Sequence, residues 1–233
     1  MNITPSNLFI ALVGGILPAL LWLWFWLHED RLSPEPRRLI IYTFLGGMAA
    51  VAVALIAEQR IALLFPLGSL IIIVLWAATE ELVKFGSAWF IALRRPENDE
   101  PIDSMVYLIT AAVGFAALEN VLFLLGPLGG GNFVNTFVTS NLRFVGSTLL
   151  HIVSSSAVGI FLAFSFCELR NIKRISAICG LILAIALHTL FNFFILKSEN
   201  NLFAVFGFVW IGVIILFLFF EAIKRRNRTC IVG

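Results

Sequence analysis

The sequence has few charged residues. Lys, Arg, Asp and Glu make up 13% of its 233 residues, whereas hydrophobic residues make up 60%. Soluble globular domains carry about 25% charged residues. The net charge is only +2, and the basic residues are scattered over short stretches of the chain. A nucleic-acid partner is therefore not expected, and the composition indicates an integral membrane protein.

Several local motifs are also missing. The three cysteines, Cys167, Cys179 and Cys230, show no CxxC or metal-ligand spacing, so neither a cysteine metal site nor a disulfide framework is expected. There is no His-Glu-x-x-His zincin motif and no Gly-x-Ser-x-Gly nucleophile motif. The first residues lack the cationic region of a signal peptide, so the first apolar run is expected to be retained as a span.

Long apolar runs dominate the chain instead. Seven runs reach the roughly 20 residues that cross a bilayer: 8–27, 39–57, 61–93, 104–125, 142–166, 175–196 and 202–220. The third run is unusually long, and Pro66 near its start would kink or begin a helix. We predict one all-α polytopic domain, residues 1–233, with about seven transmembrane helices.

Basic residues between the runs alternate in number. Alternate connections carry 12 Lys and Arg in total, and the intervening ones carry 3. The positive-inside rule then predicts an outside N-terminus and a cytoplasmic C-terminus. The uncharged connection Gly126–Asn141 would face the outside, where it could act as a lid.

Two adjacent carboxylates and a lysine lie inside the third run, in Trp76-Ala-Ala-Thr-Glu-Glu-Leu-Val-Lys-Phe85. Ionisable groups at that depth are costly. On a helix, Lys84 lies one turn from Glu80 and angularly between Glu80 and Glu81, so one ammonium can serve both. Two carboxylates so close cannot easily both ionise, which suits one of them to act as a general base. The alternative is a buried intrahelical salt bridge without chemistry.

Further polar residues interrupt the later runs. They are Glu119 with Asn120, His151, and His188 with Asn192. Glu80, Glu119, His151 and His188 are each 13 to 16 residues from the predicted cytoplasmic end of their run, or about 20–24 Å deep. This shared depth predicts one pocket. Each also has a structural alternative, such as hydrogen bonding between packed helices. His28 and Glu58 are expected at the interface, outside the pocket.

Such a set of acids and histidines can activate water in two ways. His151 and His188 could hold Zn²⁺ with a carboxylate, Glu119 being the candidate third ligand. A glutamate could instead deprotonate water directly while His188 and Asn192 stabilise the oxyanion. Two other classes use the same residues: a proton-coupled transporter or channel, and a bis-histidine haem protein.

The order of these residues resembles the motif series of the PrsW family of intramembrane proteases. The series is Glu80-Glu81-x-x-Lys84, Asp103-Ser-Met-Val-Tyr107 leading to Gly114-Phe-Ala-Ala-Leu-Glu119-Asn120, His151, and His188-Thr-Leu-Phe-Asn192. It covers about Ile71 to Asn192.

The resemblance implies a bacterial inner-membrane endopeptidase that cleaves a membrane-anchored protein, in some members an anti-sigma factor. It implies Glu80, Glu81, Glu119, His151 and His188 as active-site residues, with Lys84, Asn120 and Asn192 supporting them. Glu80 or Glu81 is then the expected base. The related CAAX prenyl endopeptidase group has Phe-x-x-x-His or Phe-x-x-x-Arg where this chain has Phe115-x-x-x-Glu119, so the mechanism of that group does not transfer directly.

Overall fold

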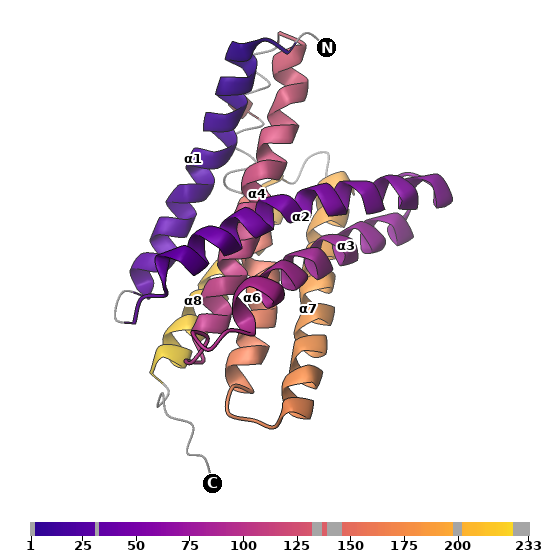
Figure 1. Cartoon of the computed structure of the whole chain (residues 1–233). Helices are drawn as coiled ribbons and strands as arrows, with labels where there is room; N and C mark the ends of the chain where they lie inside the picture. Colours follow the sequence, from indigo (N-terminus) through magenta and orange to yellow (C-terminus); the bar gives the residue numbers. More distant parts are fainter. Residues whose placement is uncertain (1–2, 31–32, 132–136, 139–145, 198–201, 226–233) are drawn as a thin grey trace.

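A computed structural model of the chain describes residues 3–30, 33–131, 137–138, 146–197 and 202–225. These residues form helices and turns, without a strand among them. The helices are α1 (Pro5–Glu29), α2 (Arg37–Leu64), α3 (Leu70–Ala88), the π-helical turn η1 (Trp89–Leu93), α4 (Asp103–Gly129), α6 (Thr148–Phe164), α7 (Arg170–Lys197) and α8 (Leu202–Lys224) (Figure 1). The predicted all-α class is confirmed.

Five of these helices are long and apolar enough to cross a membrane: α1, α2, α4, α7 and α8. Helix α6 is apolar but has 17 residues, and α3 carries Glu80, Glu81 and Lys84 in its 19 residues. The start of α1 and the end of α8 lie at opposite ends of the molecule (Figure 1), as an odd number of crossings would require.

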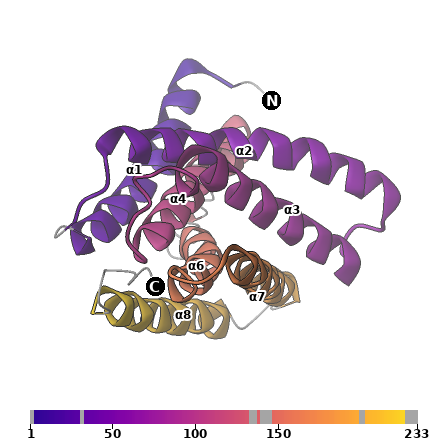
Figure 2. The same cartoon turned by 60° about the horizontal axis from the view of Figure 1, so that its bottom comes forward.

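Helix α4 is the centre of the molecule. It lies between a group formed by α1, α2 and α3 and a group formed by α6, α7 and α8 (Figure 2), and 72% of its apolar stretch is buried. Glycines allow close approach: a Cβ on Gly47 of α2 would lie 2.1 Å from the carbonyl oxygen of Ala111, and one on Gly114 of α4 would lie 2.0 Å from that of Phe44. The two backbones therefore touch directly.

The boundary between the second and third helices differs from the prediction. Helix α2 continues through Glu58-Gln-Arg60 to Leu64, because these residues are good helix formers. The chain turns at residues 65–69 instead, where Pro66 breaks the hydrogen-bond pattern and Gly68 has a positive φ of 79°. The turn η1 at the end of α3 was not predicted.

Two further contacts involve the segments that precede α2 and follow α6. The Tyr107 hydroxyl of α4 donates to the carboxylate of Glu35, which precedes α2, and partial burial raises the pKa of Glu35 above its ordinary value. Cys167, soon after α6, is disulfide-bonded, whereas Cys179 is free and exposed. This bond was not expected, because no CxxC or other paired spacing marks Cys167.

Candidate active site

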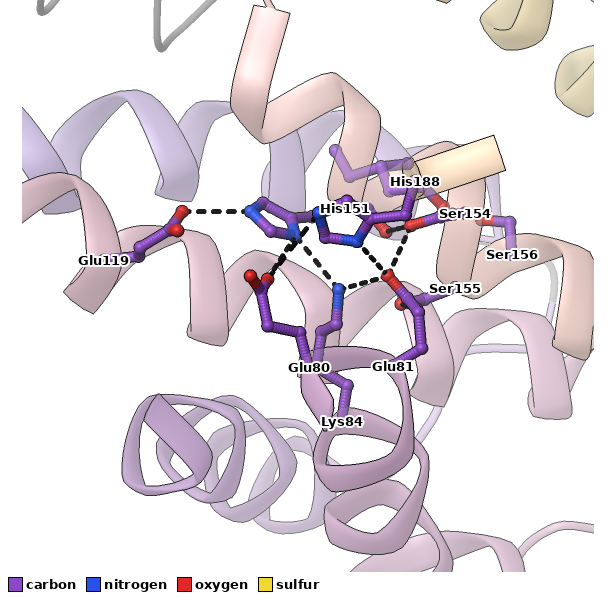
Figure 3. Close-up of polar contacts among 10 residues, drawn as sticks. Glu80, Glu81, Lys84, Glu119, His151, Ser154, Ser155, Ser156 and His188 are labelled. Carbon is purple, nitrogen blue, oxygen red and sulfur yellow. Dashed lines mark hydrogen bonds and ion pairs between the residues drawn. The ribbon is translucent and has the colours of Figure 1, made fainter. Parts of the chain in front are cut away.

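The predicted pocket forms where four helices meet. Six ionisable side chains converge there (Figure 3): Glu80, Glu81 and Lys84 from α3, Glu119 from α4, His151 from α6 and His188 from α7. All are at most 8% exposed except Glu119, which is partly exposed. The helical spacing of α3 turns its three charged residues toward α6 and α7, where the histidines are.

Both carboxylate oxygens of Glu81 accept hydrogen bonds. Its Oε1 accepts from Lys84 Nζ at 2.6 Å, from Ser154 Oγ at 2.8 Å and from His188 Nδ1 at 2.8 Å. Its Oε2 accepts from Ser155 Oγ at 2.9 Å. A carboxylate that accepts at both oxygens carries no proton of its own. Glu81 is therefore arranged to orient the other groups, and His188 donates to it through Nδ1, leaving Nε2 with a lone pair.

Lys84 and Glu119 fix His151 in the same way. Lys84 Nζ lies 2.9 Å from His151 Nδ1, and an ammonium can only donate, so Nδ1 accepts. The other ring nitrogen, Nε2, then carries the hydrogen and donates to Glu119 Oε2 at 3.0 Å. The tautomer of His151 follows from this network.

Glu80 differs from its neighbour. Its Oε2 is buried and has no hydrogen-bond partner among the described residues. It lies 3.8 Å from His151 Nδ1, whose lone pair accepts from Lys84, and 3.8 Å from His188 Nε2, the ring nitrogen that does not donate to Glu81. A buried carboxylate oxygen without a donor is costly. The three atoms therefore surround a position that a water molecule or a cation would satisfy.

A cavity of about 530 Å³ leads to this position. Glu80, His151, His188 and Asn192 line it, together with Glu58 of α2. The expectation that Glu58 lies outside the pocket is therefore wrong. It followed from ending α2 too early: the helix carries Glu58 inward past the predicted boundary, and Trp76 Nε1 of α3 donates to the Glu58 carbonyl at 3.3 Å.

Comparisons with known proteins identify the family. The model of the family described as PrsW family intramembrane metalloprotease matches residues 35–222. The chain belongs to this family. It is 25% identical to protease PrsW of Geobacillus kaustophilus, with 95% of this chain and 92% of the relative aligned. It is 26% identical to protease PrsW of Oceanobacillus iheyensis, with 95% and 98% aligned. No solved structure matches.

Membership of the PrsW family makes the protein a bacterial-type intramembrane peptidase and does not favour the transporter hypothesis. The predicted enzyme class, a membrane-embedded protease, is confirmed.

The family description implies a metal, and the residues present fit one. Glu80, His151 and His188 each offer a ligand atom, and the three atoms lie within 4.8 Å of one another. Tetrahedral Zn²⁺ with bonds of about 2.0–2.1 Å needs ligands roughly 3.3 Å apart, so a small contraction closes the site once Lys84 moves off His151 Nδ1. Each histidine also donates a hydrogen bond to a carboxylate through the N–H of its other ring nitrogen, as metal-ligating histidines usually do.

The supporting residues of the PrsW motif series separate into two roles. Asn120 Nδ2 donates to Thr148 Oγ1 at 3.0 Å and so joins α4 to α6, whereas Asn192 lines the cavity. Sequence reasoning missed Ser154 and Ser155 as partners of Glu81. Their spacing was a usable signal, because positions three and four after His151 lie on the same helix face.

Proposed function

We propose that Glu80 is the proton acceptor of this peptidase and that His151 and His188 complete the water-activating site. The observation that carries the proposal is the buried Oε2 of Glu80, without a donor among the described residues, 3.8 Å from both imidazoles at the end of the cavity. Glu81 holds His188, and Glu119 holds His151, so both carboxylates position the rings that face Glu80.

The reaction follows from these positions. Glu80 takes a proton from water, and the water oxygen attacks the carbonyl carbon of the scissile peptide bond. Asn192 lines the same cavity and can donate to the oxyanion of the tetrahedral intermediate. Glu80 then returns the proton to the amine nitrogen as the C–N bond breaks. Lys84 balances the negative charge of the surrounding carboxylates.

In the alternative metal route, Glu80, His151 and His188 would hold Zn²⁺, and Glu80 would then be a ligand and not the base. Glu119 was the expected third ligand, but it accepts from His151 Nε2, the ring nitrogen on the side away from Lys84. Glu80, which lies 3.8 Å from His151 Nδ1 and from His188 Nε2, takes its place in the proposal, and a metal on Nδ1 would displace Lys84 from that nitrogen. A bound Zn²⁺ would lower the pKa of water and polarise the peptide carbonyl.

The substrate in this proposal is a membrane-anchored protein, and an anti-sigma factor is the candidate class. The catalytic unit is a single domain, residues 1–233, with its core motifs in 71–192, embedded in a bacterial inner membrane. Seven crossings would put the N-terminus outside and the C-terminus in the cytoplasm.

The replacement Glu80→Gln tests the catalytic assignment. It keeps the shape of the side chain and removes its ability to take a proton, so cleavage should fall by about 10²–10⁴-fold. Membranes containing the full chain are incubated with a panel of single-span proteins that includes membrane-anchored anti-sigma factors, and products are mapped by mass spectrometry. Glu221→Gln, in α8, is the control and should cleave normally. Full cleavage by equally expressed Glu80→Gln protein contradicts the assignment.

Metal analysis tests the ligand set separately. The purified protein should contain about one equivalent of zinc-type metal, and both Glu80→Gln and His188→Ala should lose it. A chelator should stop cleavage, and added metal should restore it. Glu119→Gln should retain metal, since Glu119 only orients His151 in the proposal. Metal lost from Glu119→Gln and kept by Glu80→Gln would restore Glu119 as the ligand.

A further inference from the structure

A second cavity, of about 680 Å³, lies away from the catalytic residues, between the end of α3 and the turn that joins α6 to α7. Both segments lie toward the end of the molecule that holds the C-terminus (Figure 1). Five of its lining residues are basic, and none is acidic: Arg94, Arg95, Arg170, Lys173 and Arg174. The site joins two of the connections that the distribution of basic residues assigns to the cytoplasmic side.

The five basic side chains of the cavity form no ion pair with a carboxylate of the described residues. In the part of the chain that the structure describes, no carboxylate lies within 4.0 Å of any of the five. Local contacts hold some of them in place: Arg94 Nε donates to the Phe90 carbonyl at 3.0 Å, and Lys173 Nζ lies 5.0 Å from the centre of the Phe166 ring. The cavity therefore presents positive charge that an anion from outside the chain can neutralise.

The other wall of the cavity is apolar. Phe85, Trp89, Ile178 and Leu181 contribute to it, and Trp89 and Ile178 are 42% and 57% exposed. Trp89 belongs to η1, and π-helical turns often occur at functional positions. A free phosphate would make no favourable contact with this apolar wall. A molecule with an anionic head and a hydrocarbon chain would contact both the basic and the apolar wall.

We propose that this basic cavity binds an anionic phospholipid of the cytoplasmic leaflet. The lipid phosphate lies against the guanidinium groups, which bind phosphate through paired hydrogen bonds, and an acyl chain lies along Trp89, Ile178 and Leu181. Basic pockets between transmembrane helices on the cytoplasmic side suit anionic head groups. The site is separate from Glu80 and does not depend on the proposed reaction.

Lipid binding by the full-length protein tests this inference. The purified chain in neutral detergent is titrated with phosphatidylglycerol or phosphatidylcholine, and bound lipid is counted by native mass spectrometry. The wild type should prefer phosphatidylglycerol. The variant Arg94→Gln/Arg174→Gln should bind it roughly 30-fold more weakly, since each basic residue near an anionic lipid contributes to affinity. Arg94→Lys/Arg174→Lys should retain most of the preference.

The matched control removes two other charges near the same end of the molecule. Lys224 and Arg225 pair with Glu221, so Lys224→Gln/Arg225→Gln should bind phosphatidylglycerol as the wild type does. Equal binding of the two lipids by the wild type overturns the proposal. So does an unchanged preference in Arg94→Gln/Arg174→Gln, or an equal loss in the control. Complete displacement of the lipid by inorganic phosphate would reassign the cavity to free phosphate.

Discussion

Glu80 and Glu81 are adjacent and chemically identical, yet their surroundings assign them different roles. Four donors surround Glu81, whereas Oε2 of Glu80 has none among the described residues. The spacing in α3 predicted that both would lie near Lys84. It could not separate them, because the difference comes from Ser154, Ser155 and His188, which lie on other helices.

This difference predicts opposite effects on stability. Glu81→Gln leaves Lys84 without its ion pair in a buried place, which should lower the free energy of unfolding by about 3–5 kcal/mol. In the metal-free protein, Glu80→Gln removes a carboxylate whose Oε2 lacks a donor among the described residues, so stability should stay the same or rise. Thermal unfolding of both proteins in one detergent measures this. The exposed pair of Glu221 with Arg225 gives the control, because Glu221→Gln should leave the unfolding temperature nearly unchanged. Equal unfolding temperatures for the Glu80 and Glu81 variants would contradict the different roles assigned to these two residues.

At the scale of the helices, close packing between α2 and α4 carries a second prediction. A Cβ on Gly114 would lie 2.0 Å from the Phe44 carbonyl oxygen, a rigid backbone atom. Gly114→Ala should therefore force α2 and α4 apart and destabilise the protein by about 1–3 kcal/mol. Gly207→Ala in α8 is the matched control: a Cβ there meets nothing within 4 Å, so it should be neutral or stabilising by up to about 1 kcal/mol. Thermal unfolding compares them, and a Gly114→Ala protein as stable as the control would show that the contact is not tight.

Helix existence was predictable from the sequence, but several helix ends were not. Apolar runs located the helices because each run must cover the thickness of a bilayer. The end of α2 was misplaced because the charged residues Glu58 and Arg60 suggested an aqueous boundary. Charge does not end a helix; the missing amide hydrogen of Pro66 and the positive φ of Gly68 do. The same error removed Glu58 from the expected pocket.

At the scale of the whole molecule, the depth count brought the right helices together. It treated every helix as upright, and α2 and α3 instead run obliquely across α4 (Figure 1). The four residues nevertheless converge, because α3, α4, α6 and α7 cross close to these positions. Tilt depends on packing against neighbouring helices, which the sequence of one helix does not specify, so the cavity and its lining had to come from the structure.

The orientation in the membrane is the last prediction. Twelve basic residues lie in alternate connections and three in the others, and the start of α1 and the end of α8 lie at opposite ends of the molecule (Figure 1). A reporter fused after Gly233 should therefore be active only as a cytoplasmic reporter, and one inserted at Gly129–Gly131 only as an external one. Paired alkaline phosphatase and fluorescent protein fusions measure this in intact cells. The reverse pattern would turn the basic cavity toward the outside, where a cytoplasmic-leaflet lipid cannot reach it, while leaving the arrangement around Glu80 unchanged.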